Sequence, residues 1–141
     1  MSIKFAETNF EIEKCFNVMK QLRTHLKSKT EFLERVLLMK KTEKFNLVFY
    51  EENEVILCVA GIREMNKLYD GKTIYVDDLI TNTESRSKGC GTKMIEYLKR
   101  YVKENGFDGL TLDSGLQRNE AHHFYFKNNL YVSSFHFVCK L

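Results

Sequence analysis

The chain has 141 residues, of which 43% are apolar, a formal net charge of +3 at pH 7 and four scattered cysteines. This length and composition predict one domain, residues 1–141, whose core needs neither a disulfide framework nor a zinc site. The apolar runs are too short to cross a bilayer, and the first residues lack a signal-peptide core. The mild positive charge suits an anionic small molecule at least as well as nucleic acid. We therefore expect a cytoplasmic protein that binds neither membrane nor nucleic acid.

The N-terminal third is predicted to form a short strand at residues 3–6 and then two helices. Two Ser/Thr-x-x-Glu capping boxes each precede apolar residues at helical spacing, which is typical of a helix start. We expect a first helix from about residue 10 to 26 and a second, shorter helix that begins after residue 28. The two boxes are Thr8 with Glu11 and Ser28 with Glu31.

Three consecutive antiparallel strands are expected next. Two β-rich runs, residues 45–51 and 54–64, are separated by a polar two-residue break that is typical of a hairpin. A second turn signal precedes a third strand at residues 72–81. The two turn signals are Glu52-Asn53 and Asp70-Gly71.

The second half of the chain alternates helix and strand. We expect a helix from Thr92 to a left-handed cap at Gly106, a strand, a short helix capped by Asn119, and a final strand. The two strands are residues 109–113 and 131–140, and the short helix is residues 120–128. Because strand, helix and strand follow in sequence, a right-handed crossover makes strands 72–81 and 109–113 parallel.

These elements follow the order β-α-α-β-β-β-α-β-α-β. They predict an α/β (α+β) fold with a mixed, mostly antiparallel sheet of six to seven strands, a central parallel pair and helices on both faces. The apolar last strand, residues 131–138, is also a candidate edge for a homodimer.

A glycine-rich loop, Arg86-Ser87-Lys88-Gly89-Cys90-Gly91-Thr92, links strand 72–81 to the next helix. Free backbone N–H groups and the positive end of a helix meet there, which suits a phosphate, and two cationic side chains add to the attraction. The loop lacks the third glycine of a dinucleotide fingerprint, where Met94 stands, and the Lys-Ser/Thr order of a P-loop. We interpret it as the site of a pyrophosphate.

Two groups of residues resemble the Gcn5-related N-acetyltransferases (GNAT). Arg86, Gly89 and Gly91 match the acetyl-CoA loop of that family, Gln/Arg-x-x-Gly-x-Gly/Ala. About 30 residues later, Asn119-x-Ala121 is followed by Phe124-Tyr125 and then by Asn129-Leu130 in place of the usual Gly-Phe. The resemblance extends over the whole element order and implies an acyl-CoA N-acyltransferase fold with acetyl-CoA as cofactor.

The resemblance also implies how acetyl-CoA is held. The end of strand 72–81 would pair with the pantetheine amides as if they were an added strand, the loop N–H groups would meet the pyrophosphate, and Asn119 would contact the pantetheine arm. The alternatives are that the loop is an ordinary turn and that Asn119 is an ordinary helix N-cap. The implied cofactor-binding residues are Leu79, Ile80, Thr81, Arg86, Ser87, Lys88, Gly89, Cys90, Gly91, Thr92, Asn119 and Tyr125.

In the family, the tyrosine that matches Tyr125 protonates the CoA sulfur. A phenol with a pKa of about 10 suits a thiol with a pKa of about 8.5. A backbone N–H near Leu79 or Ile80 would polarise the carbonyl. The alternative for Tyr125 is an amphipathic side chain that only packs on its helix.

Asp77 and Asp78 are the candidates for the catalytic base. Neighbours on a strand point to opposite faces unless a bulge intervenes. In the diamine acetyltransferase branch an acidic pair lies at the same place, nine and eight residues before the loop arginine, and its first member, the proposed base, matches Asp77. Keeping an amine neutral at pH 7 costs about 4.6 kcal/mol, so the hypothesis includes a water relay or a raised carboxyl pKa. Alternatively, both carboxylates only bind a cationic substrate.

The resemblance implies acetyl transfer to the primary amine of a small molecule, which is polyamine-like, an amino acid or a peptide. The acidic pair favours a cation, whereas Arg23, His25 and Arg63 suit a carboxylate, and Arg23 with His25 fits a solvated helix end equally well. A non-catalytic acyl-CoA binder is the alternative function. No metal site is expected, because His122 and His123 diverge on a helix and no third ligand is spaced with them.

Overall fold

The computed structural model describes residues 2–86 and 88–141, so Ser87 of the predicted loop lies outside the described residues. The chain divides into two compact units, one up to Thr111 and the other Leu112–Leu141. The elements are β1 (Ser2–Phe5), α1 (Asn9–Lys14), α2 (Phe16–Leu22), α3 (Lys29–Thr42), β2 (Phe45–Glu52), β3 (Val55–Lys67), β4 (Gly71–Thr81), a 3₁₀ turn (Thr83–Ser85), α4 (Cys90–Glu104), β5 (Gly109–Leu112) and α5 (Asn119–Lys127).

One sheet carries the five strands in the order β1-β2-β3-β4-β5. Strands β1 to β4 are antiparallel, and β5 is parallel to β4. The mixed α/β fold class is therefore confirmed. The parallel pair lies at the edge of the described sheet rather than at its centre, because the predicted strand after α5 is missing.

The predicted last strand, residues 131–140, is wrong, and within the described residues the sheet has five strands rather than six or seven. Residues 130–141 carry neither helix nor strand, and Phe135 and Phe137 are 76% and 90% exposed. The alternating aromatic residues favour a strand, but a strand forms only where its backbone meets a partner edge. Sequence alternation does not report whether that edge is met.

The predicted first helix is two helices. The chain breaks at Cys15, whose backbone N–H bonds the carbonyl of Ile12 at 3.0 Å in a 3₁₀-type turn, and α2 then ends at Leu22. Cys15 is fully buried, so the break leaves the apolar spacing intact. The apolar spacing predicts well which residues are buried. It does not report a change in the direction of the helix axis, because the same residues stay buried on both sides of the break.

The two capping boxes differ in the structure. Thr8 and Glu11 form the complete box, with both side chain to backbone bonds at 3.2 Å. Ser28 caps α3 by accepting from the Glu31 N–H at 3.1 Å, but the Glu31 carboxylate accepts from the N–H of Lys27 instead. Helix α3 starts where predicted and runs for 14 residues, so it is longer than expected.

Both predicted turns are present. The β2–β3 turn lies at Asn53 and Glu54, one residue later than predicted, and both residues have positive φ angles of 50° and 64°. This pair of left-handed residues matches the twist of the flanking strands. The next turn reaches β4 at Gly71, where φ is +71°.

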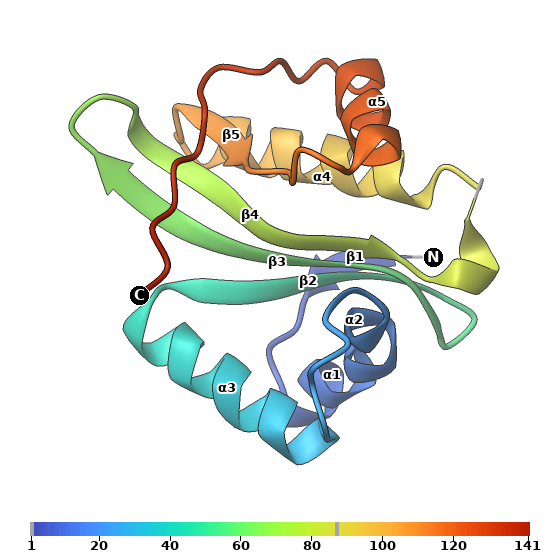
Figure 1. Ribbon diagram of the computed structural model, residues 1–141. Helices are drawn as coiled ribbons and strands as arrows, with labels where there is room; N and C mark the ends of the chain where they lie inside the picture. Colours follow the sequence, from blue (N-terminus) through green and yellow to red (C-terminus); the bar gives the residue numbers. More distant parts are fainter. Residues whose placement is uncertain (1, 87) are drawn as a thin grey trace. The chain divides into compact units, whose positions relative to one another are not determined.

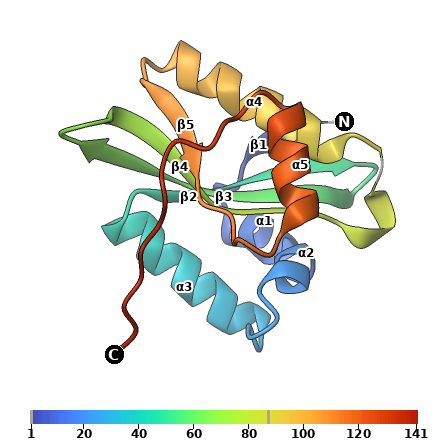
Figure 2. The same ribbon diagram turned by 45° about the horizontal axis from the view of Figure 1, so that its top comes forward.

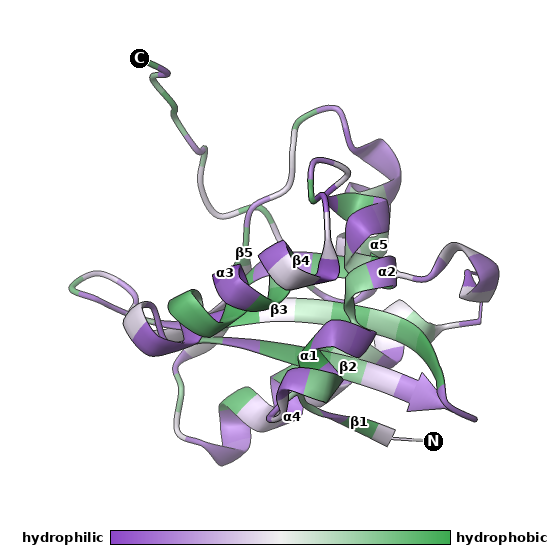
Figure 3. Ribbon diagram, turned by 90° about the horizontal axis from the view of Figure 1, so that it is seen from below, coloured by the Kyte–Doolittle hydropathy of each residue, from purple (hydrophilic) through white to green (hydrophobic). Residues whose placement is uncertain are grey.

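Helices cover both faces of the sheet, as predicted. Helices α1, α2 and α3 lie on one face and α4 on the other (Figures 1 and 2). Figure 3, seen from the side of α1 to α3, shows long apolar stretches in β2 and β3. Ile12 and Phe32 of the helices pack with Leu47 and Val59 of these strands in one buried cluster.

Helix α4 presents a single buried stripe to the opposite face of the sheet. Its members are Cys90, Met94, Ile95, Leu98 and Val102. In the described part of the chain, no helix combines the length and the hydropathy needed to span a membrane.

Strand β4 contains a bulge that shapes the candidate site. Gly61 of β3 pairs with Asp78, whereas the next residue, Ile62, pairs with Val76. Asp77 is therefore an extra residue without a partner position on β3. Such an insertion redirects the side chains around it.

Candidate active site

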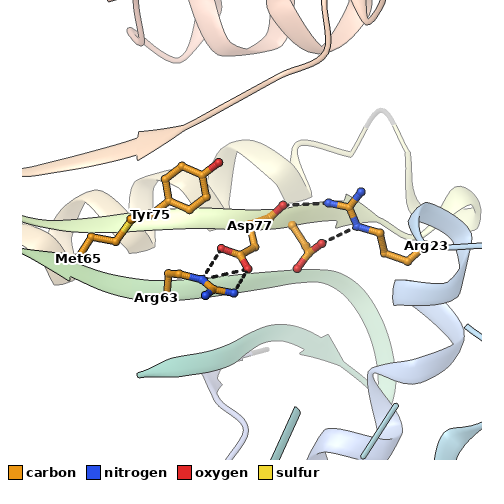
Figure 4. Close-up of a pocket in the computed structure, with 6 residues that line it drawn as sticks. Arg23, Arg63, Met65, Tyr75 and Asp77 are labelled. Atoms are coloured by element: carbon orange, nitrogen blue, oxygen red, sulfur yellow. Dashed lines mark hydrogen bonds and ion pairs between the residues drawn. The ribbon is translucent and has the colours of Figure 1, made fainter. Parts of the chain in front are cut away.

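A pocket of about 410 Å³ opens beside this bulge (Figure 4). It combines two arginines, two aspartates and two larger side chains from β3, β4 and the residue after α2. The lining residues are Arg23, Arg63, Met65, Tyr75, Asp77 and Asp78.

The bulge explains why both carboxylates line one pocket. In a regular strand, Asp77 and Asp78 would point to opposite faces. The extra residue in β4 removes that alternation, and both side chains border the same space. The structure therefore brings the two base candidates together.

Asp77 is held by Arg63. The guanidinium donates from Nε to both carboxylate oxygens at 2.9 and 3.1 Å and from Nη2 to Oδ2 at 2.5 Å. These bonds raise the pKa of Arg63, with the Asp77 hydrogen bond as the main cause. Arg63 also lies 3.7 Å from a carboxylate oxygen of Glu43. Both oxygens of Asp77 are thus used in fixing β4 to β3.

Asp78 is bound less completely. Its Oδ1 accepts from Nε of Arg23 at 2.6 Å, and Nη2 of the same arginine donates to the backbone carbonyl of Asp77 at 3.0 Å. The Asp78 side chain is 15% exposed. Burial raises its pKa and outweighs the opposing effect of Arg23. A largely buried carboxylate with a raised pKa, next to a pocket, is typical of a functional site.

Gly61 makes room for Asp78. A Cβ atom there would lie 2.6 Å from Oδ2 of Asp78 and 2.8 Å from the ring of the buried Phe45. A glycine within a β-rich run indicates a bulge or a close approach, and the sequence reasoning missed that signal.

Gly61→Ala is expected to destabilise the fold by about 1–3 kcal/mol, because either Asp78 or the Phe45 ring must shift. Urea unfolding measures the loss. Gly109→Ala is the matched strand control, since its Cβ would meet only the Thr73 methyl group at 3.9 Å. Equal stabilities of the two variants would show that the packing at Gly61 is loose.

The predicted substrate residues separate in the structure. Arg23 lines the pocket and contacts Asp78, whereas His25 is exposed and does not line it. Arg63 lines the pocket, but its bonds go to Asp77. Within the described residues, no group of three His, Cys, Asp or Glu side chains is arranged to hold a metal ion.

The end of β4 offers backbone groups to a ligand. On one side, residues 79–81 pair with β3. On the other side, the N–H of Asp108 bonds the carbonyl of Lys72 at 2.7 Å, so β5 starts beside the beginning of β4. Because β5 has four residues, its parallel pairing ends before Leu79. The edge at residues 79–81 therefore suits a pantetheine arm that adds as a strand.

The glycine loop fits an anion at the start of α4. Gly89 is the N-cap in the left-handed conformation, with φ +73°, and as a glycine it has no side chain that could cap the helix. Arg86, Lys88 and Gly89 are exposed, and Gly91 and Thr92 lie in the first turn. The N–H groups of this turn are therefore available to a phosphate.

Cys90 has a different place from the other loop residues. Its thiol is buried and its Sγ atom lies 3.8 Å from the carbonyl oxygen of Ser85. The side chain therefore anchors the loop to the 3₁₀ turn, and its backbone is what could serve a phosphate.

The second unit contains α5 and both downstream candidates. Arg118 occupies the N-cap position without a side-chain bond, and Asn119 is the first residue inside the helix, so the predicted cap is one residue off. Tyr125 is half-buried, and burial raises its pKa. The meeting of Asn119 and Tyr125 with the residues of β4 stays a prediction.

Comparison with known proteins gives one family. The family model described as "Acetyltransferase (GNAT) family" matches residues 10–129. A curated relative, "Uncharacterized N-acetyltransferase YhdJ" of Bacillus subtilis (strain 168), is 32% identical over 110 residues, covering 78% of this chain and 77% of the relative.

Solved structures agree with this chain in fold. Ribosomal-protein-alanine N-acetyltransferase from Brucella melitensis biovar Abortus 2308 aligns with a TM-score of 0.85 at 11% identity over 100% of both chains. AAC(6')-Iy, in complex with the bisubstrate analog CoA-S-monomethyl-acetylneamine, aligns with a TM-score of 0.82 at 11% identity over 99% of this chain and 97% of that chain. These likenesses confirm the fold that the sequence resemblance implies.

Proposed function

Because the chain belongs to the GNAT acetyltransferase family, we propose that it transfers the acetyl group of acetyl-CoA to the primary amine of a small molecule, by direct attack in a ternary complex. The observation that carries this proposal is the bulge in β4. It puts a largely buried carboxylate, Asp78, in a pocket a short distance along the strand from the edge that suits pantetheine.

Acetyl-CoA, when bound, supplies the acetyl group as a thioester. The backbone of residues 79–81 holds the pantetheine arm, and the N–H groups of residues 86–92 hold the pyrophosphate. Asn119 adds a contact to the arm. The exposed Gly89 at the N-cap of α4 and the short β5 support this assignment.

Asp78 takes the role of base in this proposal. The family resemblance assigns that role to Asp77, but both oxygens of Asp77 accept from Arg63. Asp78 has one oxygen that does not bind Arg23. Its raised pKa also reduces the difference between the pKa of the carboxyl group and that of an ammonium group. It accepts the ammonium proton directly or through water.

Tyr125 and the β4 backbone complete the reaction. The amine nitrogen forms the new C–N bond as the C–S bond breaks. A backbone N–H near Leu79 or Ile80 stabilises the negative charge on the carbonyl oxygen, and the Tyr125 hydroxyl donates a proton to the leaving thiolate. The raised pKa of Tyr125 keeps the hydroxyl protonated until that step.

A thiol-release screen tests the function. Acetyl-CoA is incubated with the protein and with polyamines, amino acids or peptides, and CoA thiol is measured against protein-free controls. Amine-dependent thiol release supports the proposal. Tight CoA binding without thiol release for any amine would instead show a non-catalytic acyl-CoA binder.

Gly89→Val is expected to weaken CoA binding by about 10-fold or more, because a β-branched residue resists the left-handed conformation that aims the loop N–H groups. Gly106→Val is the matched control. Gly106 follows the other end of α4 with φ +71°, and a Cβ at either glycine meets nothing within 4 Å. Calorimetric titration with CoA measures both variants. Equal affinities would refute the loop assignment.

A further inference from the structure

The pocket has no net formal charge, because two arginines balance two aspartates. Arg63 and Asp77 neutralise each other through three hydrogen bonds. The groups left to meet a substrate are Arg23 and Asp78, one cation and one anion held 2.6 Å apart. The positive charge of Arg23 would repel a polycationic acceptor from the carboxylate of Asp78, which such an acceptor would need.

The guanidinium of Arg23 has N–H donors that are available to a ligand. A guanidinium carries five N–H donors in a planar fork. Within the described chain, Nε of Arg23 bonds Asp78 and Nη2 bonds the Asp77 carbonyl, which leaves the Nη1 donors and one Nη2 donor without a protein partner. The side chain is 43% exposed. The outer edge of this fork has the geometry that binds a carboxylate through two parallel hydrogen bonds.

Asp78 offers the complementary contact. Its Oδ1 accepts from Arg23, whereas its Oδ2, which packs against Gly61, accepts no hydrogen bond from the described residues. An ammonium group at Asp78 would sit next to a carboxylate at Arg23. The two charges of such a ligand must then be close together.

We propose that the acceptor is a zwitterionic amino acid, with its carboxylate on Arg23 and its amine on Asp78. This inference rests on the proposed acetyltransferase function and narrows its acceptor from amines in general to amino acids with a free carboxylate. Arg63 and His25 take no part, because Arg63 is paired with Asp77 and His25 lies outside the pocket lining.

Calorimetric titration of the CoA-saturated protein tests the inference without turnover. L-leucine is compared with L-leucinamide, and L-phenylalanine with L-phenylalaninamide, so that within each pair a neutral amide replaces the carboxylate. We expect at least one acid to bind about 10-fold or more tightly than its amide. Equal binding within both pairs, or no binding of either acid at millimolar concentration, overturns the inference.

Arg23→Gln should remove the preference for the acid, and Arg23→Lys should restore part of it, because a lysine supplies charge without the fork. Lys20→Gln removes one exposed cation from α2 outside the pocket lining and should leave the preference unchanged. A preference that survives in Arg23→Gln, or disappears in Lys20→Gln, overturns the assignment to Arg23. Thermal melts check that each variant is folded.

Thiol release with the same pairs separates this inference from the proposed function. If the acids and the amides are acetylated with equal kcat/KM, the acetyltransferase function stands and the carboxylate site fails. If the protein binds CoA but no amine of any class releases thiol, the acetyltransferase function fails.

Discussion

Asp78→Asn is expected to lower kcat by about 10²- to 10⁴-fold on the true acceptor, without weakening CoA binding and without loss of stability. The rate falls because asparagine cannot take the ammonium proton. Stability is kept because the buried carboxylate favours its protonated form: it stabilises the fold below a pH of about 3.8, and this contribution is lost as the pH rises through the raised pKa. At neutral pH, the neutral asparagine avoids the free-energy cost of burying the charge of Asp78.

Asp77→Asn is the matched control on the same bulge. It leaves Arg63, whose side chain is 23% exposed, without its bidentate partner, and we expect a loss of about 1–3 kcal/mol in the free energy of unfolding. Urea unfolding and steady-state kinetics are measured on both variants. Loss of turnover in Asp77→Asn, with normal turnover in Asp78→Asn, would return the base role to Asp77.

The pH profile gives a second readout of the Asp78 variant. Because Asp78 must be deprotonated to act, wild-type kcat/KM should fall as the pH drops through the raised pKa, above the value of about 3.8 for an unperturbed aspartate. That limb should vanish in the residual activity of Asp78→Asn. An unchanged limb would assign it to another group.

Local signals in the sequence predicted the scaffold well. The Thr8 capping box, the turn at Gly71 and the left-handed Gly106 each depend on a few neighbouring residues, and all three are present. The anion-binding geometry of the loop follows from the same local rule, since glycine is the residue that adopts a positive φ angle without strain.

Non-local pairing is where the sequence was insufficient. The register shift that makes Asp77 an extra residue depends on how β4 aligns with β3, and the absence of a strand after α5 depends on a partner edge. Neither is encoded in the alternation of a single segment. The sequence also did not predict that Arg63 binds Asp77 and Arg23 binds Asp78. The reason is the same, because the two arginines come from different elements.

Tyr125→Phe is expected to lower kcat by about 10²- to 10⁴-fold, with CoA affinity and the melting temperature close to wild type. The hydroxyl is the group that donates to the leaving thiolate, whereas the ring, which lies 5.4 Å from that of Phe124 in an edge-on arrangement, is kept. Burial raises the pKa of Tyr125, so loss of its hydroxyl proton should not limit activity at neutral or mildly alkaline pH. Tyr131→Phe is the control, because Tyr131 is 84% exposed in the same unit and should be neutral. Unchanged turnover in Tyr125→Phe would exclude Tyr125 as the acid.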